Sequence, residues 1–132
     1  MTRINLVPVT ELYDQHLMAE YRELPRIFTY AQSLKEIPKD IPKTYTMGKG
    51  HVKFFSDKTK FLMTRQLELI HELLCRGFKI NFDQAKLYEQ YSSIDKRFKN
   101  GYTPTDEEVA ISRQRIEEKL SAKPGWYRKT TY

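Results

Sequence analysis

The sequence predicts a mostly α-helical protein that forms a single compact domain over residues 1–132, with three main helices and long irregular connections. The first observation is periodicity: in three segments apolar residues recur every three or four positions, the spacing of one helix face. The second is that glycine and proline fall mainly between these segments. The third is size, because 132 residues with 39% hydrophobic content suffice for one core and would be cramped as two domains.

An apolar stripe marks the first predicted helix. Its members follow one another at spacings of four, three, four and three: Leu17, Tyr21, Leu24, Phe28 and Ala31. Thr10 is a candidate N-cap, because its hydroxyl can accept a hydrogen bond from the first turn. Pro25 lies within the stripe and has no N–H to donate to the carbonyl of Tyr21, so we expect a kink or one disturbed turn.

The second predicted helix, about 57–76, has the widest apolar face. One line consists of Met63, Leu67, Ile70 and Leu74, and beside it lie Leu62, Leu69 and Leu73. This width predicts a central, heavily buried helix. Gly77 suits the position just after the helix end, with Phe78 placed for the accompanying apolar contact. We expect Cys75 to be a small core residue.

The third predicted helix has the clearest start, because Thr105 and Glu108 have the spacing of a capping box. We expect it to end before Pro124-Gly125. Its predicted core line consists of Val109, Ile116 and Leu120. Arg115 and Lys119 lie four positions apart on a different face and form a short cationic ridge. Segments 35–56 and 79–104 lack sustained periodicity and are interpreted as long, partly ordered connections.

The charge and the cysteine count restrict the function classes. A formal net charge of +6 favours a polyanionic partner such as nucleic acid. A single cysteine excludes an internal disulfide and indicates a reducing compartment. His16, His51 and His71 are widely spaced, without a metal-binding motif, so we expect no metal. Without a long apolar run, we expect a soluble intracellular protein with no membrane partner.

The start of the chain offers a reactive group. The small second residue, Thr2, allows the initiator Met1 to be removed, which leaves a free α-amine beside a hydroxyl. The reference pKa of an α-amine, about 7.7 to 8.0, leaves a useful neutral fraction near pH 7. Such an amine is a plausible nucleophile without special burial.

The first predicted helix carries a group of polar side chains that avoid its apolar stripe. Arg22 and Arg26 lie one turn apart, and His16 and Glu23 lie two turns apart, so each pair shares an angular sector. The alternative is that Glu20 and Glu23 are ordinary solvated helix charges. Spacing alone favours that alternative.

Several strings of the chain closely resemble the phage-type pyrimidine-dimer DNA glycosylase family, the ultraviolet-damage enzyme also called endonuclease V. They are Thr2-Arg3-Ile4-Asn5-Leu6, Asp14 to Arg26, Gly48 to Phe55, Arg76-Gly77-Phe78 and Ala110-Ile111-Ser112 with Arg115 to Lys119. The most specific string runs from Gln15-His16-Leu17 to Leu24-Pro25-Arg26. Residues 29–45 and 81–104 match poorly, and the tail from Trp126 to Tyr132 is shorter than the family's.

The resemblance implies a mostly helical DNA glycosylase and abasic-site lyase domain that acts on double-stranded DNA containing pyrimidine dimers or abasic sites. By that resemblance Thr2 supplies the nucleophilic amine and Glu23 the catalytic carboxylate. The DNA-binding residues it implies are Arg3, Gln15, His16, Arg22, Arg26, Arg115 and Lys119. We expect a monomer that needs no cofactor. Trp126 and Tyr127 either stack on DNA or pack against the core.

The chemistry agrees with these residue types. A carboxylate stabilises the positive charge that develops on a sugar when its glycosidic bond breaks, and an imine on C1′ permits β-elimination without metal or redox cofactor. A damaged site is also easier to kink, and a nucleotide opposite it is easier to extrude. Two alternatives stay open at this point: a glycosylase for another damaged base, and a non-catalytic basic helical DNA-binding module.

Overall fold

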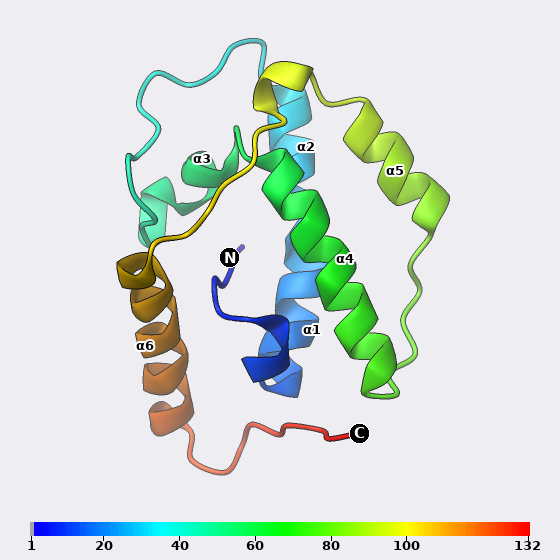
Figure 1. The fold of residues 1–132 in the computed structure, drawn as a ribbon, viewed down its shortest axis with the longest axis vertical. Helices are drawn as coiled ribbons and strands as arrows, with labels where there is room; N and C mark the ends of the chain where they lie inside the picture. Colours follow the sequence, from blue (N-terminus) through cyan, green and yellow to red (C-terminus); the bar gives the residue numbers. More distant parts are fainter. Residues whose placement is uncertain (1) are drawn as a thin grey trace.

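A computed structural model describes residues 2–132 and confirms a mostly helical fold (Figure 1). The α-helices are α1 (Asp14–Glu23), α2 (Pro25–Ser33), α3 (His51–Phe55), α4 (Thr59–Cys75), α5 (Gln84–Ser92) and α6 (Asp106–Ala122). Short 3-10 turns occur at Val9–Glu11, Gly48–Gly50 and Lys96–Phe98. Three long helical stretches, α1 with α2, α4 and α6, correspond to the three predicted helices.

Helix α4 is the centre of the packing, as its wide apolar face predicts. It packs against α1, α2 and the 3-10 turn Val9–Glu11, and α2 also contacts α5. Leu62, Leu69 and Leu73 are fully buried on its inner side. The other predicted line is only half correct, because Leu67 and Leu74 are exposed. That side of α4 faces away from α1 and α2, while the inner side buries polar residues that the apolar pattern could not reveal.

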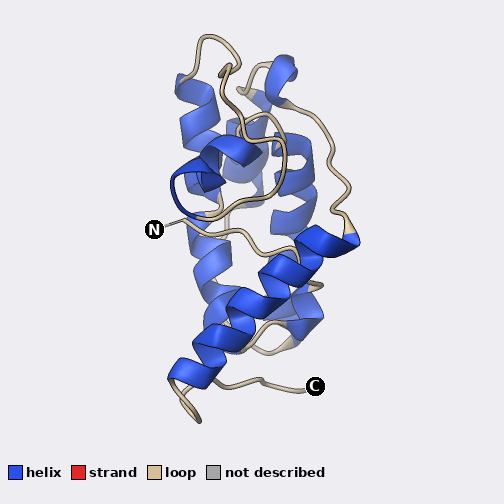
Figure 2. Cartoon of the chain, turned by 90° about the vertical axis from the view of Figure 1, so that its left-hand side faces the viewer, coloured by secondary structure: helices blue, strands red, loops and turns tan. Residues whose placement is uncertain are grey.

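Helix α6 lies apart from the packed pair of helices α1 and α4. Figure 2 shows it crossing obliquely in front of the other helices, and Figure 1 shows the first residues of the chain between α6 and the α1–α4 pair. Ile116 joins the core from α6, while Val109 and Leu120 are only partly buried against it. The N-terminal segment is therefore enclosed by α1 and α4 on one side and, on the other side, by α6 from the opposite end of the sequence.

The predicted helix ends are largely confirmed. Thr105 and Glu108 form the capping box, each side chain bonded to the other's backbone N–H. Gly77 has φ +87°, and the N–H groups of Gly77 and Phe78 donate to the carbonyls of Leu74 and Leu73. This is the Schellman arrangement, in which a left-handed residue closes the helix.

Pro25 separates α1 from α2, as predicted, although Leu24 between them keeps helical angles of φ −55° and ψ −42°. The proline takes the first position of α2, where its missing N–H costs nothing. Thr10 as the N-cap is wrong. Thr10 lies within the separate 3-10 turn Val9–Glu11, which is followed by the buried Leu12, so α1 begins only at Asp14, after Tyr13.

Two helices were not predicted. Helix α3 has five residues, too few to display a period, and its Phe54 and Phe55 are buried in an aromatic cluster with Tyr45. Helix α5 has no buried residue and therefore no strong apolar stripe, although Asp83 caps it by accepting a hydrogen bond from Lys86. Cys75 is half-buried beside His71 and is not the core residue that we expected.

Candidate active site

The N-terminal segment, residues 2–7, is the part of the chain on which the site is built. Ile4, Asn5, Leu6 and Val7 are all buried. The N–H of Ile4 donates to Nε2 of His51 at 2.8 Å, and its carbonyl accepts from the Tyr45 hydroxyl at 2.7 Å. The N–H of Leu6 donates to Oγ of Ser112, on α6, at 2.9 Å. Side chains from distant parts of the sequence thus satisfy backbone groups of a segment that pairs with no strand among the described residues.

A buried ion pair fixes the other side of the N-terminal segment. Arg65 of α4 makes a two-pronged contact with Glu20 of α1, with Nε to Oε2 at 2.7 Å and Nη2 to Oε1 at 3.1 Å. The same arginine donates to the carbonyl of Val7, and Glu20 accepts from the side-chain amide of Asn5. Glu20 is therefore not a solvated helix charge. The sequence did not reveal this contact, because the helix that contains Arg65 was predicted from its apolar residues alone.

A pocket of about 340 Å³ opens where the N-terminal segment, α1 and α6 meet. It is lined by Arg3, Asn5, His16, Ala19, Glu20, Glu23, Arg115, Ile116 and Lys119. Five of the residues predicted for the site therefore come together: Arg3, His16, Glu23, Arg115 and Lys119. The α6 ridge faces α1 across this pocket, which is a juxtaposition that spacing within one helix could not establish.

The pocket has three cationic side chains, Arg3, Arg115 and Lys119, and two carboxylates, of which Glu20 is already paired with Arg65. Burial lowers the pKa of Arg3, and the neighbouring Arg115 lowers it further, against an opposing effect of Glu23. Burial also lowers the pKa of His16, with smaller contributions in the same direction from Arg3 and Lys119. These cationic neighbours and burial therefore keep His16 neutral, and the positive charge that suits an anion comes from Arg3, Arg115 and Lys119.

Residues 123–132 form a tail that packs along α1 beside the pocket. The Tyr127 ring stacks on His16 with centroids 4.5 Å apart. Trp126 remains half-exposed, with Nζ of Lys123 over its ring. The tail is held by Asp14, which accepts hydrogen bonds from the N–H and hydroxyl of Thr130 and from Arg76.

The remaining predicted residues lie elsewhere. Gln15 uses both ends of its side chain on the tail, donating to the Trp126 carbonyl and accepting from the Arg128 N–H. Arg22 and Arg26 are exposed and do not line the pocket. Thr2 is half-buried and precedes Arg3, which lines the pocket, but Thr2 itself is not one of the lining residues. Removal of Met1 concerns a residue outside the described range.

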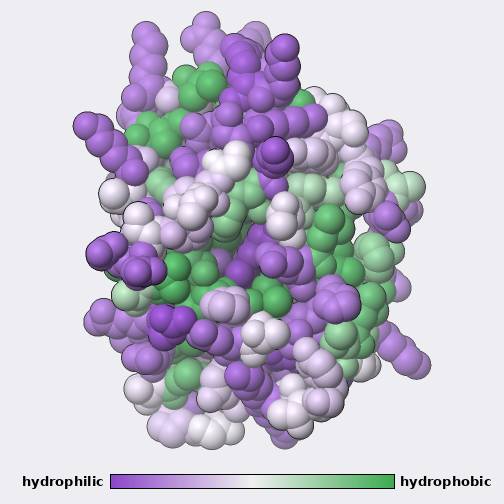
Figure 3. All heavy atoms as spheres, viewed as in Figure 1, coloured by the Kyte–Doolittle hydropathy of each residue, from purple (hydrophilic) through white to green (hydrophobic). Residues whose placement is uncertain are grey.

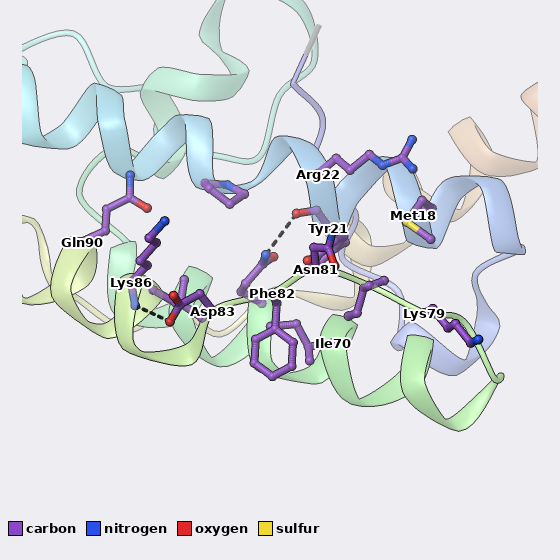
Figure 4. A pocket seen from close by; sticks show the side chains of 14 residues that line it. Met18, Tyr21, Arg22, Ile70, Lys79, Asn81, Phe82, Asp83, Lys86 and Gln90 are labelled. Atoms are coloured by element: carbon purple, nitrogen blue, oxygen red, sulfur yellow. Dashed lines mark hydrogen bonds between the residues drawn. The ribbon is translucent and has the colours of Figure 1, made fainter.

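A second, larger pocket of about 550 Å³ lies on the other side of Arg22, between α1 and the segment leading into α5. Figure 4 shows Lys86 and Gln90 at one end and Met18 and Lys79 at the other, with Tyr21 next to Asn81 between them. Gln66 also lines it, and its buried Oε1 accepts no hydrogen bond from residues 2–132. The pocket thus combines apolar and charged side chains with a hydrogen-bond acceptor that no described residue uses.

On the face of the molecule drawn in Figure 3, hydrophilic side chains prevail at the edges and apolar side chains reach the surface between them. Within residues 2–132, no group of three or more His, Cys, Asp or Glu side chains is placed to hold a metal ion. Over the same residues, no helix is long and apolar enough to cross a membrane.

A helical fold in which a carboxylate shares a small pocket with several cationic side chains is typical of an enzyme that acts on a polyanion. The family model for pyrimidine dimer DNA glycosylases matches residues 1–86, from the N-terminal segment into α5. The chain belongs to this family of DNA repair enzymes. The match includes Arg3, His16 and Glu23, whereas Arg115 and Lys119 join the site through the position of α6.

Proposed function

We propose that the protein cleaves the N-glycosidic bond at cyclobutane pyrimidine dimers and then nicks the strand by β-elimination, through a Schiff base on the Thr2 α-amine. It acts as a monomer on double-stranded DNA that contains pyrimidine dimers or abasic sites. The observation that carries this proposal is the pocket itself, in which Glu23, His16 and three cationic side chains converge one residue from Thr2.

The first step is attack of the neutral amine on C1′ of the damaged nucleotide. The bond from C1′ to the base nitrogen breaks, and its electron pair leaves with the base, which takes up a proton. Positive charge develops on the sugar as this bond weakens. The Glu23 carboxylate, at the wall of the pocket, stabilises that charge and exchanges protons with the reacting groups.

The second step is strand cleavage. Loss of the amine proton and opening of the sugar give a protonated imine on C1′, which acidifies the hydrogen on C2′. A base removes that proton, a double bond forms between C2′ and C3′, and the 3′ phosphate leaves with the electron pair of the C3′–O bond. Water then hydrolyses the imine and returns the free amine of Thr2.

The cationic side chains bind phosphates on either side of the damage. Arg3, Arg115 and Lys119 do so from the pocket, and Arg22 and Arg26 from the exposed surface that runs from α1 into α2. Gln15 supports the tail, which places Tyr127 against His16. Shape and ease of deformation then select the dimer, since its stacking and pairing are already weakened.

The second pocket supports extrusion of a nucleotide during this selection. Its volume of about 550 Å³, the apolar side chains among its lining residues and the Oε1 of Gln66, which no described residue uses, suit a base that carries an amino group. A 2-aminopurine placed opposite the dimer reports this directly, because its fluorescence rises when it leaves the base stack. We expect that rise on binding of the enzyme to the dimer and not on binding to an undamaged duplex.

Borohydride trapping on an abasic duplex tests the proposal. The expected product is a covalent complex in which peptide mapping places the adduct on the Thr2 α-amine. A preparation that retains Met1 is the matched control, because one added residue displaces the amine and a shift of about 1 Å costs on the order of a hundredfold in rate.

An adduct on an internal lysine would refute the assignment of Thr2. Binding of damaged duplex without any covalent adduct or base release would instead support the non-catalytic DNA-binding module. Base release from a different lesion, with none from a dimer, would favour the glycosylase for another damaged base.

A further inference from the structure

His51 holds the N-terminal segment at Ile4, two residues from Thr2. The imidazole Nε2 accepts the Ile4 N–H at 2.8 Å, and Nδ1 lies 2.8 Å from the carbonyl of Thr46. His51 is only 3% exposed. The adjacent Tyr45 hydroxyl donates to the Ile4 carbonyl, so two neighbouring side chains hold the amide N–H and the carbonyl of one residue.

The donor and acceptor roles of these two backbone groups determine which ring nitrogen of His51 carries the proton. A backbone N–H can only donate and a backbone carbonyl can only accept, so Nε2 must be the acceptor and Nδ1 must carry the proton. A second proton on Nε2 would face the Ile4 N–H as donor against donor. The hydrogen bond to Ile4 therefore exists only while His51 is neutral.

We propose that His51 is a positioning residue for the Thr2 amine: its neutral ring fixes Ile4 and thereby the place from which the amine reaches the pocket. This inference rests on the proposed function, because it concerns the delivery of that amine. The ring itself does not line the pocket and does not contact the reacting atoms. It acts through two residues of backbone.

Packing alone would not require a histidine here. The ring meets Tyr45 and Phe55 edge to face, each with centroids 5.4 Å apart, and a phenyl ring could supply the same contacts. What a phenyl ring lacks is the acceptor nitrogen. Its loss would leave the Ile4 N–H buried without a partner, a state that favours rearrangement of the segment.

The groups around His51 keep it neutral under working conditions. Burial lowers its pKa, opposed by the hydrogen bond to the Thr46 carbonyl; Arg3 and Arg115 lower it, whereas Glu20 raises it. The Tyr45 ring, which meets His51 edge to face, is itself neutral because burial raises its pKa to about 12. The net shift is downward, so protonation of His51 follows protonation of the amine as the pH falls.

The experiment compares His51→Phe and His51→Gln with the wild type and with His71→Phe, an exposed histidine on α4 that serves as the matched control. The readout is the single-turnover rate of borohydride trapping on an abasic duplex from about pH 8 down to the pH at which NMR shows His51 to be protonated, beside the affinity for undamaged duplex. Gln at position 51 can offer an oxygen to the Ile4 N–H and does not titrate.

We expect His51→Phe to trap at least about tenfold more slowly than wild type near neutral pH, with affinity for undamaged duplex unchanged, because the amine is displaced. His51→Gln restores most of the rate. Below the pKa of His51, two protonations lower the wild-type rate, that of the amine and that of His51. In the Gln variant only protonation of the amine lowers the rate. His71→Phe behaves as wild type throughout.

Equal trapping by His51→Phe and wild type overturns the inference, as does an acid limb of the Gln variant that matches wild type. If His51→Phe fails to fold by circular dichroism, the acid limb of His51→Gln decides alone. Absence of any Thr2 adduct in the wild type is a different result: it refutes the proposed function whatever residue occupies position 51.

Discussion

Glu20 and Glu23 lie three positions apart on α1 and have opposite surroundings. Glu20 is buried and bound by Arg65 and Asn5, so its charge is fully engaged in holding the fold. Glu23 is half-buried at the wall of the pocket, and no described residue donates a hydrogen bond to it. Its charge is available to a substrate, which is the property that the proposed glycosylase step needs.

Replacement of Glu23 by glutamine should keep the fold and remove most of the activity. The shape is nearly conserved, but the charge that stabilises the sugar cation is lost, and groups of this kind contribute on the order of a hundredfold to a thousandfold in rate. Base release from a dimer-containing duplex under single-turnover conditions measures the loss. Glu68→Gln, on the exposed side of α4, is the control; activity of Glu23→Gln within a few-fold of wild type would make Glu23 a solvated charge.

The Arg65–Glu20 pair should matter far more for stability than an exposed pair of the same geometry. Arg65→Leu leaves a buried carboxylate without its cation, which costs about 3–5 kcal/mol of unfolding free energy. The chain contains a matched control in Arg113→Leu, since Arg113 also holds Glu11 with two nitrogens, but in water. Urea unfolding of both variants measures the difference, and equal losses would contradict the role assigned to burial.

At the scale of the elements, the sequence predicts best where backbone chemistry is local. The capping box of α6, the glycine end of α4 and the interruption at Pro25 depend on residues within a turn of one another, and all three were predicted. Helices α3 and α5 were missed because one is too short for a period and the other buries no residue. Apolar periodicity detects only helices that are long and half-buried.

For the site too, the sequence predicted only which residues share a face of one helix. Helical spacing places His16 and Glu23 on one face of α1, and Arg115 and Lys119 on one face of α6. That these faces meet across the N-terminal segment depends on packing between distant parts of the chain, through Ser112 and Leu6. Asn5 and Glu20 were missed as neighbours of the site for this reason, since each is held by a partner more than ten residues away. Tyr127 was expected either to stack on DNA or to pack against the core, and its ring stacks on His16.

Gly77→Ala tests the end of α4. The left-handed backbone at φ +87° penalises a β-carbon by about 1–2 kcal/mol, although no neighbouring atom lies within 4 Å of the position that it would occupy. Gly101→Ala is the matched control, because its surroundings are equally open and its φ is not in the left-handed region. Thermal unfolding should therefore show a lower midpoint for Gly77→Ala alone. Equal midpoints for the two variants would mean that the helix end carries no strain.

At the scale of the whole molecule, the charges behind the net +6 are not expected to contribute equally to DNA binding. Arg115 and Lys119 on α6 face the pocket, whereas Arg113, on another side of the same helix, pairs with Glu11. A duplex that enters over the pocket would therefore contact one side of α6 only. Long-range attraction involves all the charges, but counterion release depends on those that meet phosphates.

Lys119→Gln should weaken duplex binding and reduce the slope of log K against log salt by about 1, the loss of one phosphate contact. Arg113→Gln removes the same formal charge from the same helix and should leave the slope unchanged. Fluorescence anisotropy with an undamaged duplex over a series of salt concentrations measures both. If Lys119→Gln kept the wild-type slope, the pocket side of α6 would not be the DNA surface.

The hydrogen bond from Leu6 to Ser112 spans 106 positions of sequence and makes the site one of the last features that a growing chain can complete. On the ribosome, the N-terminal segment emerges well before α6, which supplies Ser112 and, with Arg115 and Lys119, one wall of the pocket. Until α6 has formed, the Leu6 N–H lacks its acceptor and the pocket is open on that side. A fragment that ends before α6 therefore carries the N-terminal segment without the cationic wall, and we expect it to bind a duplex less tightly than the complete fold.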